Sequence, residues 1–252
     1  DPGVVLADLA LALCLCAGRA PAYVVVVDPG HGGDQEGALS PAGDREKDLA
    51  LAIARRTAAK LKRAGVKVVL TRTGDISVPL ANRAAVANAL RADLFLSIHL
   101  NSMPTAEQRR TYAGLETYFL SAGASDASAS AVAARENADR LAGEPVADPN
   151  DPVAAILSDL EDQASLQGAS RLAYALHDRL LAALGVEDHG VKQAPFYVLA
   201  GARMPAVLLE LGFISHPDES QRLRDPAYQD RIATAIAEGV AAFRGQGKRA
   251  GR

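Results

Sequence analysis

Two histidines and a glutamate stand where a hydrolytic metal site could be built. His31 lies in a Gly- and Pro-rich segment directly after an apolar valine run, and His99 directly follows a second apolar run. Glu46 comes fifteen residues after His31, just before a pattern typical of an amphipathic helix. Two histidines and one carboxylate are a recurring ligand set of catalytic zinc, in which water takes the fourth position. These residue types therefore indicate a catalytic zinc site near His31, Glu46 and His99.

A second glutamate, Glu210, lies inside the otherwise apolar segment 206–213. An ionised carboxylate is costly in such a segment unless it is paired, close to a metal ion or used in a reaction. Beside a zinc-bound water, a carboxylate can take the proton of the water and deliver it to a leaving nitrogen. We therefore predict that Glu210 is a general acid–base residue. The alternative is a buried ion pair with Arg72 or Arg83.

Plainer interpretations of these residues stay open when each is taken alone. A histidine after a strand is usually a polar loop residue, and the helix dipole favours a glutamate such as Glu46 in the first turn of a helix. Of the other histidines, His177 is expected on the surface of a helix. His189 and His216 are expected in loops that could touch a substrate. None of these three histidines is expected to bind the metal.

Alternating strand and helix patterns connect these residues. Continuous apolar runs predict strands at residues 23–27, 66–70, 94–98, 115–120, 195–199 and 206–213. Helical periodicity predicts helices at residues 48–63, 82–90 and 227–243, and one or two more within 152–184. The alternation predicts a single α/β domain, with a twisted, mainly parallel sheet flanked by helices and with a helical insertion. In such sheets, functional groups gather at the carboxyl ends of the strands.

The chain divides into a leading segment, one large domain and a short tail. Residues 1–22 hold an apolar run followed by small residues, so they are either the remnant of a secretory signal or an N-terminal helix packed on the domain. The run is too short for a comfortable membrane span. Residues 23–245 form the expected catalytic domain, with a regulatory insertion at 121–168, and residues 246–252 form a basic tail. We expect a periplasmic or otherwise extracytoplasmic location.

Length and composition narrow the function classes. The chain has 252 residues, of which 49% are hydrophobic and 23% charged, as in a soluble globular protein. A chain of this length can bury a large core without a structural metal, so a bound metal is expected to be catalytic. The net charge of −3 and the lack of a basic stripe argue against nucleic acid as the partner. Cys14 and Cys16 are badly placed for an ordinary disulfide.

Several motifs around the site residues resemble one known family. The motifs are residues 27–33, 45–47, 71–75, 97–101 and 205–214, in that order along the chain. Together they resemble the zinc-dependent N-acetylmuramoyl-L-alanine amidases of the cell-division type. The resemblance implies zinc bound by His31, Glu46 and His99, with Glu210 as the catalytic carboxylate. It also implies cleavage of the amide bond between N-acetylmuramic acid and L-alanine in peptidoglycan.

Two other functions are consistent with the same ligand set. The first is a zinc carboxypeptidase or deacetylase that acts on another bond of the cell wall. The second is a wall-binding regulator that has kept the fold and lost the chemistry. A regulator of that kind would be expected to lack a ligand or Glu210, and all of these positions are filled here.

The insertion carries a second pattern with a regulatory interpretation. Residues 148–152 have the acid and proline of a helix start, and apolar residues follow at helical spacing. The resemblance implies a helix inserted here that covers the active site, blocks zinc with a carboxylate and is pulled away by an activator protein. Alternatively, the apolar residues pack on the sheet and the acids face solvent. The candidate blocking carboxylates are Asp159, Glu161 and Asp162.

Overall fold

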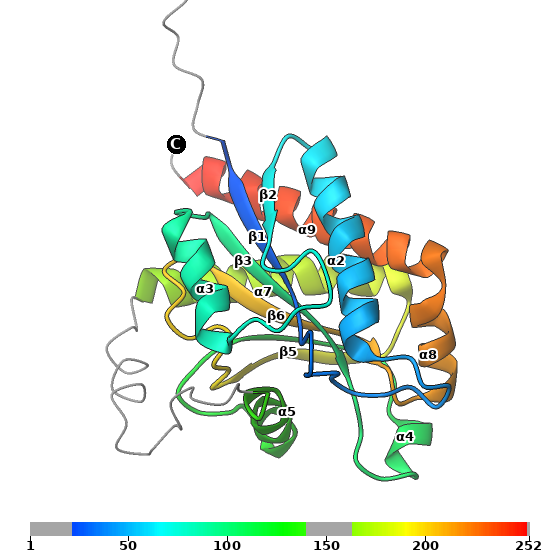
Figure 1. Cartoon of the computed structure of the whole chain (residues 1–252). Helices are drawn as coiled ribbons and strands as arrows, with labels where there is room; N and C mark the ends of the chain where they lie inside the picture. Colours follow the sequence, from blue (N-terminus) through cyan, green and yellow to red (C-terminus); the bar gives the residue numbers. More distant parts are fainter. Residues whose placement is uncertain (1–21, 140–162, 251–252) are drawn as a thin grey trace, which may run out of the picture.

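The apolar runs form the centre of one twisted sheet. The computed structural model describes residues 22–139 and 163–250 (Figure 1). Strands β1 (Val24–Pro29), β3 (Leu94–Asn101) and β6 (Ala206–Phe213) are buried along their whole length. Continuous apolar runs suit the central strands of a parallel sheet, because helices cover both faces of the sheet and keep the apolar side chains away from water. The three strands lie side by side in the six-stranded order β2-β1-β3-β6-β4-β5.

Shorter or more polar strands complete the sheet. These are β2 (Lys67–Leu70), β4 (Leu115–Leu120) and β5 (Asp188–Ala194). Only the pairing of β4 with β6 is antiparallel among the described strands, so the prediction of a mainly parallel sheet is confirmed. The parallel strands β1, β3 and β6 therefore bring their carboxyl ends to the same edge.

Helices cover both faces of the sheet, each over its own apolar core. One core contains residues of α2 (Glu46–Arg63), α7 (Gln163–Leu184) and α9 (Pro226–Ala250). The other core contains residues of α3 (Leu80–Ala89) and α5 (Ala127–Asn137). Two short helices lie nearer the surface, α4 (Gln108–Thr111) and α8 (Pro217–Arg224). In Figure 1, α5 lies beneath the sheet, at the edge where β1 and β3 end.

One predicted strand is wrong. Residues 195–199 form no strand; residues 197–201 make a turn, and the strand lies just before them, in β5. The apolar side chains of this segment instead enter the core under α3 and α5, where Phe196, Val198 and Leu199 are buried. β5 is a half-buried edge strand with the sequence DHGVKQA, so it lacks the apolar run on which the prediction relied. It contains His189, so the prediction of a loop at that histidine is wrong.

His177 is buried, so its predicted surface position is also wrong. Its Nδ1 atom lies 3.0 Å from the Thr117 hydroxyl, and its Nε2 atom lies 2.8 Å from Asp188 Oδ1. Because Thr117 belongs to β4 and Asp188 begins β5, the imidazole joins α7 to both strands. The polar contacts allow burial of an imidazole on a helix face that otherwise packs apolar residues.

Two element ends also differ from the predictions. β3 continues to Asn101, so His99 lies inside the strand and not after it. α9 continues to Ala250, so most of the expected tail at 246–252 extends this helix.

Some predictions lie outside the described residues. One is the prediction of a secretory signal or an N-terminal helix at residues 1–22, of which only residue 22 is described. The other concerns the candidate blocking carboxylates Asp159, Glu161 and Asp162. Among the described residues, no helix combines the length and apolar character needed to cross a membrane.

Candidate metal centre

Four buried side chains converge at the edge of the sheet near α5. His31 follows β1, Glu46 begins α2, His99 lies in β3 and Glu136 lies in α5. Each offers one ligand atom, and these atoms all lie within 4.8 Å of one another. The structure thus brings together the three ligands expected from the sequence and adds a fourth group, the Glu136 carboxylate, which the sequence did not predict. This group could hold a metal ion.

His31 has an unusual backbone conformation. Its φ angle is 57°, in the left-handed region that side chains with a Cβ rarely adopt. The guanidinium of Arg83 donates a hydrogen bond of 2.9 Å to the His31 carbonyl oxygen and so holds the loop in place. Strained residues of this kind persist where the surroundings fix them, and they cluster at functional sites.

Two buried arginines support the chain that leads to His31. Arg72 donates to the carbonyl oxygens of Pro29 and Gly30, at 3.1 and 2.7 Å. Arg83 also donates to Pro29 O, and it forms an ion pair of 2.9 Å with the fully buried Asp28. The guanidinium groups of both arginines bind this loop, and neither is paired with Glu210. The alternative interpretation in which one of them pairs with the predicted general acid–base glutamate is therefore wrong.

The Glu46 carboxylate is held by backbone N–H groups on both sides. Its Oε1 atom accepts from Leu100 N and its Oε2 atom accepts from Ala38 N, each at 2.9 Å. Its Oε1 atom also lies 2.9 Å from His31 Nε2. A carboxylate fixed in this way is preorganised as a ligand, because its rotamer no longer has to be selected on binding.

The chain packs tightly against the His99 ring. A Cβ atom added to Gly30 would lie 2.4 Å from His99 Cε1, a distance at which something must shift. The two imidazole centroids are 4.9 Å apart with a 75° interplanar angle, so the rings of His31 and His99 meet edge to face. Glycine is therefore required at position 30 to leave space for the second imidazole.

α5 contributes a carboxylate from the opposite side. Asp126 caps the helix by accepting a hydrogen bond of 2.7 Å from Ala129 N. Glu136, the penultimate residue of the helix, places Oε2 at 2.9 Å from His99 Nδ1 and 3.4 Å from His31 Nε2. The only sequence signal was the charged pair at 135–136 within a helix built mostly of Ala and Ser.

Several buried polar atoms in the cluster have no hydrogen-bond partner among the described residues. They include His31 Nε2, His99 Nδ1 and Glu136 Oε2. The Glu136 oxygen lies close to both ring nitrogens, but neither contact has the geometry of a hydrogen bond. Buried polar atoms are normally satisfied, and each exception needs an explanation. A cation between them would satisfy all three, so the residues present fit a bound metal.

The four groups shift one another's pKa. Burial lowers the pKa of His99, but the carboxylates of Glu136 and Glu46 outweigh burial and raise it to about 9. Burial acts in the same way on His31, and Glu46 and Asp139 raise its pKa well above the usual value. Burial raises the pKa of Glu46, but His31 lowers it well below the usual range. Metal binding needs neutral imidazoles, so a divalent ion at this cluster would compete with protons for the nitrogen atoms of the two rings.

Glu210 lies beside the cluster and is almost fully buried. In the sheet it is opposite His99 of β3 on one side and Glu116 of β4 on the other. Neither carboxylate oxygen has a hydrogen-bond partner within the described part of the chain, and Arg135 Nη2 lies 3.5 Å from Oε1. Burial, followed by the nearby Glu136, raises the pKa of Glu210 well above its usual value. A carboxylate in this position, beside the ligand cluster and without another hydrogen-bond partner among the described residues, is available for proton transfer.

An open groove of about 840 Å³ leads from the cluster to the surface. The loop after β1 and the segment after β3 line the groove, as do residues of α5. The groove reaches His31, Glu46 and Glu136, so a long substrate could approach the cluster along it. The wall residues include Asp34, Glu36, Leu39, Met103, Pro104 and Arg109.

The amino-acid sequence matches a family model described as N-acetylmuramoyl-L-alanine amidase over residues 25–242. It is 36% identical over 222 residues to the amidase AmiA of Escherichia coli (strain K12), covering 87% of this chain and 75% of that protein. It is 35% identical over 225 residues to the amidase AmiC of Neisseria meningitidis serogroup B, covering 88% of this chain and 52% of that protein.

Solved structures agree with this match. The N-acetylmuramoyl-L-alanine amidase of Clostridium difficile 630 superposes with a TM-score of 0.69 at 30% identity, covering 90% of this chain and 98% of that chain. The amidase AmiC2 of Nostoc punctiforme superposes with a TM-score of 0.67 at 29% identity, covering 88% and 97% of the two chains.

Proposed function

The chain belongs to the N-acetylmuramoyl-L-alanine amidase family, and from this we propose that His31, Glu46 and His99 hold a catalytic zinc ion beside Glu210. The enzyme hydrolyses the amide bond between N-acetylmuramic acid and L-alanine in peptidoglycan. Since peptidoglycan lies outside the cytoplasmic membrane, we propose an extracytoplasmic location, which includes the periplasm.

The unsatisfied nitrogen atoms of the two imidazoles are the observation that carries the zinc assignment. Two nitrogens and a carboxylate oxygen suit zinc, whereas magnesium and calcium prefer all-oxygen sites. The Glu46 carboxylate is oriented by backbone N–H groups from two different segments, as expected for a ligand supported by its surroundings.

The mechanism follows from where Glu210 lies. A bound zinc ion would supply a polarised water and withdraw electrons from the scissile carbonyl group. Glu210 takes a proton from the attacking water and delivers it to the nitrogen of L-alanine as the amide bond breaks. Its burial excludes bulk water that could exchange this proton.

Metal analysis of the purified protein tests the zinc assignment. We expect about one zinc ion per chain, since the cluster offers one compact set of ligands. Peptidoglycan digestion should stop after treatment with a chelator and return on addition of zinc, with release of peptides that begin with L-alanine. Full digestion by the metal-free protein would contradict the assignment.

We also propose that the described arrangement is an inhibited form, with α5 as the inhibitory element. Glu136 lies where the fourth zinc ligand would be, and a carboxylate there would replace the catalytic water. Arg135 lies 3.5 Å from Glu210 and so pairs with the proposed proton carrier. This assigns the block to Glu136. The roles expected for Asp159, Glu161 and Asp162 stay a prediction, as does an activator protein that displaces the inserted helix.

Glu136→Ala is expected to raise the activity of the isolated enzyme about tenfold or more, because it removes the competitor of the catalytic water. Initial rates on purified peptidoglycan measure this effect. Ser130→Ala is the matched control, because Ser130 is an exposed residue of the same helix and belongs neither to the metal cluster nor to the lining of the groove. Equal rates for Glu136→Ala, Ser130→Ala and the wild type would contradict inhibition by α5.

A further inference from the structure

The guanidinium of Arg135 occupies a small cluster of hydrogen-bond acceptors next to the metal ligands. Its Nη2 atom donates to Asn101 Oδ1 at 2.9 Å, and its Nη1 atom donates to the Ser102 carbonyl oxygen at 2.8 Å. Glu210 Oε1 lies 3.5 Å from the same Nη2 atom. We call Asn101 Oδ1, Ser102 O and Glu210 the acceptor cluster. In the inhibited form, this cluster holds a nitrogen cation.

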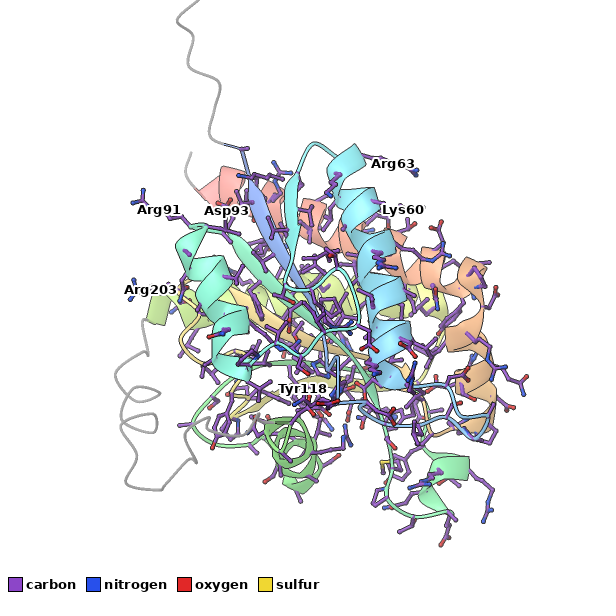
Figure 2. All side chains as sticks on the ribbon, in the orientation of Figure 1. Lys60, Arg63, Arg91, Asp93, Tyr118 and Arg203 are labelled. Atoms are coloured by element: carbon purple, nitrogen blue, oxygen red, sulfur yellow. The ribbon has the colours of Figure 1, made fainter. Side chains whose placement is uncertain are left out.

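The orientation of the Asn101 side chain is fixed by a buried network. Its Nδ2 group donates to Glu116 Oε2 at 2.5 Å, so its Oδ1 atom must face the other way, toward Arg135. Glu116 is held in turn by Tyr118 OH at 3.0 Å and by Lys192 Nζ at 2.9 Å. Figure 2 labels Tyr118 at the lower edge of the sheet, above α5. The network therefore holds Asn101 Oδ1 in place as a hydrogen-bond acceptor for a donor group beside Glu210.

The amidase reaction produces one nitrogen cation, and it does so beside Glu210. The oxygen of the water bonds to the lactyl carbonyl carbon, and the bond from this carbon to the L-alanine nitrogen breaks. The two water protons end on that nitrogen, the first through Glu210, which leaves a carboxylate and an ammonium group. Arg135 must leave the acceptor cluster before a substrate can enter, and the cluster then faces the nitrogen that is gaining charge.

We infer that the acceptor cluster is the leaving-amine subsite, in which Asn101 Oδ1 and the Ser102 carbonyl bind the L-alanine nitrogen as it becomes an ammonium. The inference rests on the proposed function and adds Asn101 to the residues that touch the substrate. An amide nitrogen is a weak donor and an ammonium a strong one, so these contacts strengthen as the reaction proceeds. Contacts that strengthen in the transition state raise kcat more than they lower KM.

The test compares Asn101→Ala with Tyr118→Phe, both in a Glu136→Ala parent that has lost the proposed block. Both substitutions remove one bond to Glu116, but only the first removes the acceptor. We expect Asn101→Ala to lower kcat about ten- to hundredfold with KM nearly unchanged, the usual effect of losing a hydrogen bond to a charged group. Tyr118→Phe should stay within about twofold of the parent. Asn101→Ser replaces Asn101→Ala if the latter fails to fold.

A binding experiment gives a second readout. Titration calorimetry would compare the dipeptide L-alanyl-γ-D-glutamate with its N-acetylated form, which has no ammonium. The parent should prefer the free amine, and Asn101→Ala should lose most of this preference while its zinc content stays unchanged.

Two results would overturn the subsite. One is an equal loss of kcat in Asn101→Ala and Tyr118→Phe, which would mean that the network acts only through folding. The other is an unchanged preference for the free amine in Asn101→Ala. A parent without amidase activity would instead contradict the proposed function, and the preference for the free amine would still test the subsite.

Discussion

Glu210→Gln is expected to lower kcat by about 10²–10⁴-fold, the usual contribution of general acid–base catalysis, while zinc stays bound. Glutamine has nearly the shape of glutamate, so the packing of β6 should be kept. It cannot take a proton from the water, and so the leaving nitrogen receives none from this position. Rates on purified peptidoglycan and the zinc content of the same samples measure the two effects separately.

Glu219→Gln is the matched control for this experiment. Glu219 is also a buried glutamate, but its Oε2 atom accepts hydrogen bonds from the N–H groups of Gly114 and Phe213, away from the metal cluster. The control should keep its kcat even if it loses some stability. Loss of zinc from Glu210→Gln would make Glu210 a ligand, and near-normal turnover would make its role structural.

His99→Ala is expected to abolish both zinc binding and activity, because two remaining protein ligands hold zinc poorly. Gly30→Ala should weaken zinc binding and activity less than His99→Ala does. Its new Cβ atom would lie 2.4 Å from the His99 ring and would displace this ligand without removing it. Zinc analysis measures the loss, and circular dichroism separates it from unfolding.

Gly74→Ala is the matched control for the glycine substitution. A Cβ atom at Gly74 would meet no atom within 4 Å, and the φ angle there is not in the left-handed region. This variant should keep its zinc and its rate. Full zinc occupancy in His99→Ala would contradict the ligand assignment, and a folded Gly30→Ala with normal zinc affinity would contradict the steric argument.

The sequence by itself determined the class of fold, and it contains the signals for four of the residues that we propose for the site. The buried strands β1, β3 and β6 are predictable because a continuous apolar run needs only local information and the cost of exposing it to water. His31, His99 and Glu210 are recognisable because each follows or interrupts an apolar run with a polar group, and Glu46 because it precedes an amphipathic helix pattern. The edge strand β5 is not predictable in this way, because its sequence DHGVKQA contains no apolar run.

Only the tertiary structure decided which other groups reach the metal cluster. Glu136 and Arg135 enter it because α5 packs its apolar face, with Ala129, Val132 and Ala133, on the core below the sheet. That packing joins segments far apart in sequence. Arg135 donates to the carbonyl oxygen of Ser102, 33 residues away, and Asp139 lies 3.0 Å from His31, 108 residues away. Hydrophobic burial is non-directional, so the local pattern shows that α5 must pack but not which polar residues the packing carries to the metal.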